Sequence, residues 1–202
     1  MDLFGFEPPP KLKRPTGPRA GSYRLFFALF PEGGAAEKIL ALGAELKSRH
    51  RLTGKLHLKE RLHLTLDHLG DFEGKPEDIV KAASEAGGEL AAQCQGFAVR
   101  LDRTMSFGRD GETRPLVLSH AGGGNTALED FRDRLWSGLA ARKLPGPSRK
   151  SFTPHVTLLY SPQGLNDQAV DLVTWHASEF VLVHSAVGDK QYEVLGRWSL
   201  QT

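Results

Sequence analysis

Two stretches of this sequence share one pattern, RLHLTLDHLG at Arg61–Gly70 and SFTPHVTLLY at Ser151–Tyr160. Each contains His-x-Thr-Leu within a short apolar run that is typical of a β-strand. Side chains at positions i and i+2 of a strand point to the same face. Each stretch is therefore predicted to present one imidazole and one hydroxyl together, while the apolar residues between them face a core.

The four polar side chains are His63, Thr65, His155 and Thr157. One His-x-Thr in a strand carries no functional information, but two copies with the same following Leu favour a shared chemistry. Hydrolysis of a phosphodiester needs a base for the attacking water and an acid for the leaving oxygen, and histidine can do either near neutral pH. The two threonines could hydrogen-bond the non-bridging phosphate oxygens. This arrangement requires no metal ion.

The two motifs resemble those of the 2H phosphoesterase superfamily, specifically the bacterial RNA 2′,3′-cyclic phosphodiesterases historically called 2′-5′ RNA ligases. The first family motif, His-x-Thr-Leu-x-Phe-Leu-Gly, is similar to positions 63–70, and the second, Pro-His-x-Thr-Leu-x-Arg, is similar to positions 154–160. The opening YRLFFALFP and the closing QYEVLGRWSL are also similar to the ends of family members. The resemblance covers about residues 23–200.

Two positions depart from the family motifs. His68 stands where the family usually has a core Phe, and we expect a half-buried neutral histidine there. Tyr160 stands where the family often has an Arg that touches phosphate. Tyr160 can still donate a hydrogen bond, but the positive charge at that position is lost, and another basic residue could supply it.

The resemblance implies an α+β fold with two pseudo-symmetric lobes of mostly antiparallel sheet, helices on the outside, and a central cleft between the two HxT strands. It implies hydrolysis of an RNA 2′,3′-cyclic phosphate to a 2′-phosphate, with His155 as the base and His63 as the acid, or the reverse. With a 5′-hydroxyl RNA in place of water, the same site would join RNA ends reversibly through a 2′-5′ bond. Two alternatives stay open: a small cyclic nucleotide or an ADP-ribose cyclic phosphate as substrate, or an RNA-end-binding module without turnover.

Basic residues precede both motifs, which favours an anionic substrate such as an RNA end. They are Lys47, Arg49, Arg51, Lys55, Lys59 and Arg61 before the first motif, and Arg142, Lys143, Arg149 and Lys150 before the second. We take Arg61, Arg149, Lys150 and Tyr160 as candidate substrate ligands; the alternative is that the cations belong to solvated loops. Phe107, in a polar loop, is a candidate for stacking on an RNA base, or it packs against the core.

The composition suits one domain, or one domain of two similar lobes, in 202 residues. A single cysteine, Cys94, excludes an internal disulfide and fits a reducing cytoplasm. The chain has no apolar run near twenty residues and no signal-peptide pattern, so we expect a cytoplasmic monomer that binds no membrane. Zinc-ligand spacing, a P-loop and a Gly-x-Ser-x-Gly elbow are all missing from the sequence, so we expect no metal and no cofactor.

The proline- and glycine-rich residues 1–22 carry the whole net charge of +2 and are expected to form a disordered basic tail before the domain at 23–202. The remaining pattern predicts a loose internal duplication of strands and helices. Helices are expected at 35–51, 76–92, 126–142 and near 165–173, and strands at 23–30, 97–101, 114–119, 179–184 and 192–200 besides the two motifs.

Overall fold

The computed structural model describes residues 22–108, 112–144, 152–186 and 191–202. The expected tail, apart from its last residue, and the candidate ligands Arg149 and Lys150 lie outside these ranges. The strands are β1 (Tyr23–Leu29), β2 (Leu64–Phe72), β3 (Phe97–Ser106), β4 (Arg114–Ser119), β5 (Val156–Ser161), β6 (Gln168–Ala177), β7 (Glu179–Ser185) and β8 (Glu193–Ser199). The helices are α1 (Ala35–Arg49), α2 (Glu77–Ala91) and α3 (Thr126–Ala141), with a 3₁₀ turn, η1, at Lys59–Arg61.

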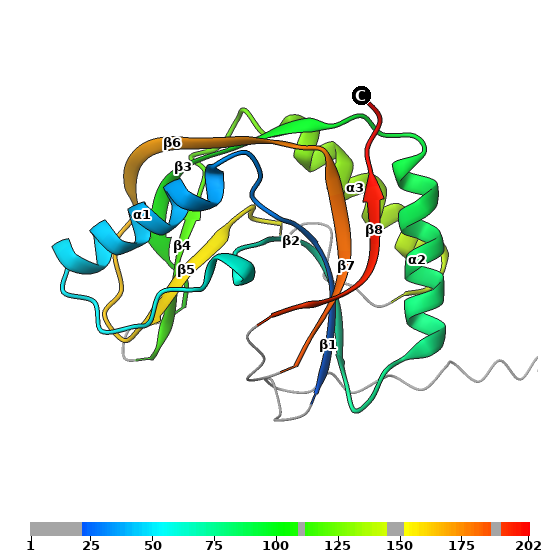
Figure 1. Cartoon of the computed structure of the whole chain (residues 1–202), viewed down its shortest axis with the longest axis horizontal. Helices are drawn as coiled ribbons and strands as arrows, with labels where there is room; N and C mark the ends of the chain where they lie inside the picture. The colour runs from blue at the N-terminus through cyan, green and yellow to red at the C-terminus, as the bar shows by residue number, and fades with distance from the viewer. Residues whose placement is uncertain (1–21, 109–111, 145–151, 187–190) are drawn as a thin grey trace, which may run out of the picture.

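The eight strands form one curved sheet in the order β6-β3-β4-β5-β2-β1-β7-β8 (Figure 1). Every pairing between these strands is antiparallel. The middle of the sheet is its weakest junction, because β2 and β5 are joined through one residue pair, Leu64 with Val156. The sheet is therefore divided into two four-stranded halves, β6-β3-β4-β5 and β2-β1-β7-β8. This confirms the predicted α+β fold of two antiparallel lobes.

The three helices lie on the outside of the sheet, and two of them repeat one connection (Figure 1). Helix α1 links the paired strands β1 and β2, and α3 links the paired strands β4 and β5. Helix α1 packs on the opposite half, against β5 and β6, whereas α3 packs against β2 of the opposite half and β3 of its own half. The predicted apolar stripe of α3 is buried in the main core: Leu128, Phe131, Leu135 and Leu139.

Strand β1 is buried on both faces, as its unbroken apolar run predicts. Phe27 belongs to the main core under the helices. Phe26 and Ala28, on the opposite face, join a smaller cluster with Val181 and Val183 of β7. This second cluster supports the sheet face that carries the polar motif residues.

The helix expected near residues 165–173 is wrong. Residues 168–177 form β6, which pairs with β3 at the edge of the sheet. In its second half Val173, Trp175 and Ala177 are buried and alternate with exposed residues, which is the period of a strand with one covered face. Strand β3 also runs beyond the expected Leu101, because the ladder to β6 shifts register there and then continues.

The loop before the first motif lies close against β5, and one glycine permits this. The His57 N–H donates to the Leu158 carbonyl at 2.9 Å. A Cβ atom on Gly54 would stand 1.9 Å from the Tyr160 carbonyl oxygen.

We therefore expect Gly54→Ala to push the loop off β5 and to lower the free energy of unfolding by about 1–3 kcal/mol. Urea denaturation measures this, with Gly74→Ala as the control because a Cβ there meets nothing within 4 Å. Equal stability of the two variants would contradict the expectation.

Candidate active site

His63 and His155 each stand immediately before a strand at the junction of the two lobes. Their following residues, Leu64 and Val156, are the pair that joins β2 to β5, and both are fully buried. Directly opposed residues of an antiparallel ladder point to the same face. One step along this register places His63 opposite Thr157, and by the same geometry His155 stands opposite Thr65. The two motifs therefore meet in a nearly two-fold arrangement on one face.

The two imidazoles are held in the same way. Nδ1 of His63 lies 2.9 Å from the Arg61 carbonyl oxygen, and Nδ1 of His155 lies 2.7 Å from the Thr153 carbonyl oxygen. A carbonyl can only accept, so Nδ1 carries the proton in each neutral ring. Within the described ranges, Nε2 of neither ring has a hydrogen-bond partner. Each ring therefore keeps Nε2 as the nitrogen that can take or give a proton to a ligand.

Both motif strands bulge at the leucine of the motif. The register of β2 against β1 skips Leu66, and the register of β5 against β4 skips Leu158. A bulge adds one residue to a strand and re-aims the side chains beyond it. As a result His68 in β2 and Tyr160 in β5 return to the face that carries the histidines and threonines.

A pocket of about 370 Å³ opens on this face, a size suited to a small ligand. It brings together six of the predicted site residues: His63, Thr65, His155, Thr157, Arg61 and Tyr160. Six further residues complete its wall: Arg24, Phe26, His57, His68, Ser185 and Tyr192. The basic members all come from the first-motif side, whereas β5 contributes His155, Thr157 and the exposed ring of Tyr160.

Phe107 lies beside the second motif rather than on the pocket wall. Its ring centroid is 5.0 Å from that of His155, and the two rings meet edge to face. The ring therefore packs against the imidazole, and its stacking on an RNA base stays a prediction. Of the six basic residues before the first motif, Arg61 reaches the pocket, whereas Arg49 and Lys59 pair with exposed glutamates on α1.

Burial makes both imidazoles weak bases in the free protein. It lowers the pKa of His63 to about 4, and the nearby charges of His57, Arg61 and His155 act in the same direction. Burial also lowers the pKa of His155 below its ordinary value, against the opposing effect of the hydrogen bond to Thr153. Both rings are therefore neutral at pH 7 until an anion enters the pocket.

Tyr192, which precedes β8, is a site residue that the sequence analysis missed. Its hydroxyl oxygen lies 2.9 Å from Nδ1 of His63 and 3.4 Å from the Arg61 carbonyl oxygen, to which it donates. Burial raises the pKa of Tyr192 to about 12, so the hydroxyl stays protonated. The contact fixes the ring of His63 from a strand 129 residues away in sequence. The only sequence signal was the similarity of the closing stretch to family ends, which assigns no role to this tyrosine.

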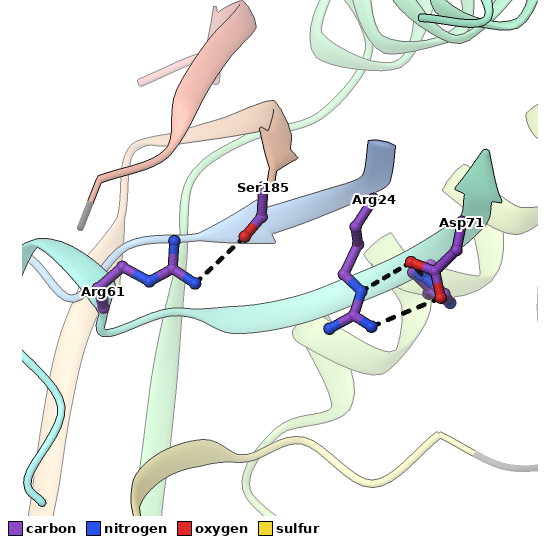
Figure 2. Close-up of polar contacts among 5 residues, drawn as sticks. Arg24, Arg61, Asp71 and Ser185 are labelled. Carbon is purple, nitrogen blue, oxygen red and sulfur yellow. Dashed lines mark hydrogen bonds and ion pairs between the residues drawn. The ribbon is translucent and has the colours of Figure 1, made fainter. Parts of the chain in front are cut away.

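Two other histidines line the pocket, although the sequence analysis did not place them in the site. His57 lines the pocket, and burial followed by the charge of Arg61 lowers its pKa. His68 is half-buried as expected but does not simply replace a core Phe, because it faces the pocket with Nε2 3.6 Å from Asp71. Asp71 in turn accepts a hydrogen bond from Nε of Arg24 at 2.8 Å (Figure 2).

The described residues contain no group of three or more His, Cys, Asp or Glu side chains placed to hold a metal ion. In the same parts of the chain, no helix combines the length and apolarity that crossing a membrane needs. A larger hollow of about 700 Å³ lies between α2 and α3, but no motif residue lines it. The pocket between the motifs is therefore the candidate active site.

Comparison with known proteins agrees with the motifs. A family model described as the 2′-5′ RNA ligase superfamily matches residues 36–189. The chain belongs to this superfamily. A search of curated proteins found no match. The superfamily, also known as the 2H phosphoesterases, indicates an enzyme that acts on phosphodiesters.

Solved structures of the superfamily share the whole fold. Apo LigT of E. coli is 28% identical, with a TM-score of 0.69 over 91% of this chain and 100% of that chain. LigT of E. coli complexed with 3′-AMP is 27% identical, with a TM-score of 0.70 over 90% and 99%. The protein TT0787 of Thermus thermophilus is 25% identical, with a TM-score of 0.69 over 88% and 98%. This chain therefore shares its two-lobed antiparallel sheet with these solved structures.

Proposed function

We propose that this 2H phosphoesterase opens the 2′,3′-cyclic phosphate at an RNA end and leaves a 2′-phosphate, without a metal ion. The observation that carries the proposal is the pair of imidazoles, each anchored through Nδ1, with Nε2 free toward one pocket that also holds Thr65 and Thr157. The structure of E. coli LigT with 3′-AMP supports a ribose phosphate as the ligand class.

In the proposed reaction one histidine gains a proton and the other loses one. Nε2 of His155 takes a proton from water as its oxygen bonds to phosphorus. The bond from phosphorus to the 3′-oxygen breaks, and that oxygen takes the proton from Nε2 of His63. Thr65 and Thr157 hydrogen-bond the non-bridging oxygens, on which negative charge grows in the transition state. Tyr192 and the Arg61 carbonyl keep the ring of His63 in the orientation that this transfer needs.

The same site could also join two RNA ends, with the 5′-hydroxyl of a second RNA attacking phosphorus in place of water while the 3′-oxygen leaves. The phosphate would then be joined through a 2′-5′ bond, which agrees with the description of the superfamily. The alternative substrates are a small cyclic nucleotide and an ADP-ribose cyclic phosphate, and the non-enzymatic alternative is an RNA-end-binding module. We propose a cytoplasmic monomer whose partner is the RNA end.

The deciding experiment incubates the purified protein, in EDTA, with a short RNA that ends in a 2′,3′-cyclic phosphate. Parallel reactions contain 2′,3′-cyclic AMP and an ADP-ribose cyclic phosphate. Mass and phosphatase sensitivity identify the terminal group of each product. We expect a 2′-phosphate on the RNA and the highest kcat/KM for that substrate. RNA binding without product would favour the binding module, and turnover of a small cyclic phosphate alone would favour the small-ligand alternative.

The pH dependence of the reaction follows from the two lowered pKa values. Catalysis needs one neutral and one protonated histidine, so kcat/KM should be bell-shaped between the two pKa values of the free pair. Because the pKa of His63 is about 4 and that of His155 lies below its ordinary 6.5, the maximum of kcat/KM is expected below pH 6.5. The maximum of kcat should lie higher, because a bound phosphate anion raises both pKa values. Rates measured in EDTA from pH 4 to 9 test this, and a flat profile between about pH 5 and 9 would refute two-histidine catalysis.

A further inference from the structure

Arg61 is a cation without a carboxylate. It lines the pocket, and no Asp or Glu of the described residues forms an ion pair with it. Its Nη2 donates to Oγ of Ser185 at 3.2 Å, and Figure 2 shows the side chain directed to the end of β7. Its Nη1 is buried and has no hydrogen-bond partner among the described residues. An arginine on a pocket wall with no carboxylate partner among the described residues favours an anion as the ligand.

The guanidinium of Arg61 is also held in position. Its Cζ atom lies 4.0 Å from the ring centroid of Tyr192, within the range of a cation–π contact. Tyr192 supports the plane of the guanidinium and Ser185 occupies one of its edges. The same tyrosine contacts His63, so the fixed cation stands next to one of the two proton-transfer groups. A ligand that reaches the guanidinium from the pocket would therefore require little further ordering of this side chain.

Among the described residues, the opposite wall of the pocket carries no Lys or Arg. Tyr160 of β5 lies on the same pocket, is 50% exposed, and offers a hydroxyl where a longer basic side chain could reach the ligand. Arg24, which also lines the pocket, is paired with Asp71 at 2.8 Å. Arg61 is thus the pocket arginine whose charge is not offset by a carboxylate of the described residues.

We infer that Arg61 binds the phosphate of the substrate through the part of its guanidinium that lines the pocket, and so supplies from the first lobe the charge that Tyr160 does not supply from the second. The inference rests on the proposed function for the identity of the substrate, whereas the anion site rests on the contacts of Arg61. Burial is the main cause of the low pKa of His63, and an anion bound there would offset the smaller effect of the charge of Arg61. Phosphate binding would thereby prepare His63 to carry a proton.

Calorimetric titration with inorganic phosphate tests the site without any need for turnover. Arg61→Gln is expected to weaken phosphate binding about tenfold to a hundredfold, which is the usual effect of losing a charge-assisted hydrogen bond. Arg61→Lys should be intermediate, because it keeps the charge but loses the fork. The matched control is Lys59→Gln, which removes one charge from the same 3₁₀ turn at an exposed site paired with Glu37. It should bind phosphate like the wild type.

A double variant tests whether a positive charge on the second lobe can replace the charge of Arg61 on the first. Arg61→Gln combined with Tyr160→Arg should recover most of the lost affinity, which a purely structural role of Arg61 does not predict. Thermal unfolding checks that each variant is folded, and Arg61→Lys decides the question if Arg61→Gln does not fold.

Wild-type affinity in Arg61→Gln, an equal loss in Lys59→Gln, or no phosphate binding by the wild type would overturn the anion site. A double variant no better than Arg61→Gln would overturn the exchange with Tyr160. Loss of phosphate binding in Arg61→Gln without any wild-type turnover of cyclic RNA would refute the proposed function and leave the anion site standing.

Discussion

Replacing either His63 or His155 with alanine is expected to lower kcat on the cyclic phosphate by roughly 10²–10⁴-fold. Each substitution removes one of the two motif imidazoles, and no other histidine of the described pocket wall is anchored through Nδ1 to a backbone carbonyl. The double variant should lose little more than either single one, because two groups that act as a unit are not additive. Single-turnover rates with the RNA substrate measure the chemical step directly.

The control for these variants is His176→Ala, on the exposed side of β6 and outside the pocket. It should keep the wild-type rate. Affinity for inorganic phosphate in the His63 and His155 variants should change much less than kcat, since the threonines and Arg61 remain. A rate within tenfold of wild type for both His63→Ala and His155→Ala would contradict two-histidine catalysis.

The division of roles between the histidines has its own test. A nucleoside p-nitrophenyl phosphodiester carries a leaving group that departs without a proton. If His63 is the acid, His63→Ala should recover much of its lost rate on this substrate, whereas His155→Ala should not, because water still needs a base. Recovery in His155→Ala alone would reverse the assignment and leave the pair itself intact.

Local alternation predicted that the histidine and threonine of each motif share a face, whereas the expectation that the two motifs meet came only from the family resemblance. Leu64 and Val156 turn into the core, so the residues on either side of each face the other way. The motif leucines could not be recognised as bulges, because a bulge is defined by the partner strand. Their register against β1 and β4 is what returns His68 and Tyr160 to the pocket.

The residues that support the histidines were missed for a different reason. Ser185 and Tyr192 belong to the end of β7 and the start of β8, which reach the site only because β7 pairs with β1 beside β2. No local pattern around either residue predicts this. The expected helix near 165–173 failed because none of the first five residues of β6 is buried, so no apolar face marks the strand there. The residues and the strand that the sequence did not predict therefore depend mostly on long-range strand pairing.

The bulge at Leu66 has a second effect, on stability. It turns Asp67 away from the pocket and into the core, where Oδ2 lies 3.8 Å from Nη2 of Arg132 on α3. Both residues are 1% exposed. Burial raises the pKa of Asp67 from its ordinary 3.8 to about 6, although the charge of Arg132 acts against this rise. The pair is thus a buried ion pair with an incompletely stabilised carboxylate.

We expect Asp67→Leu to lower the free energy of unfolding by about 3–5 kcal/mol, because Arg132 keeps its charge and loses this buried partner. Arg132→Met should cost less at pH 5 than at pH 7. The sign follows from linkage: a folded-state pKa above the unfolded value contributes stability below about pH 4, which is lost as the pH rises through about 6. Removing Arg132 raises the pKa of Asp67 further, so the carboxyl can become neutral in the folded state at pH 5.

Urea denaturation at pH 5 and pH 7 distinguishes these effects, with Arg134→Met as the control on the exposed side of the same helix. The double variant Asp67→Leu/Arg132→Met should recover most of the loss, since two apolar residues of similar volume replace two desolvated charges. If Asp67→Leu costs less than about 1 kcal/mol, the pair is not a major determinant of stability. If the cost of Arg132→Met is the same at both pH values, the carboxylate is not the group left unpaired. Recovery in the double variant would show that the charge of Asp67 contributes little to stability once Arg132 is also replaced. The bulge at Leu66 would then matter for placing His68 on the pocket, and the buried ion pair would be a side effect of the bulge in the core.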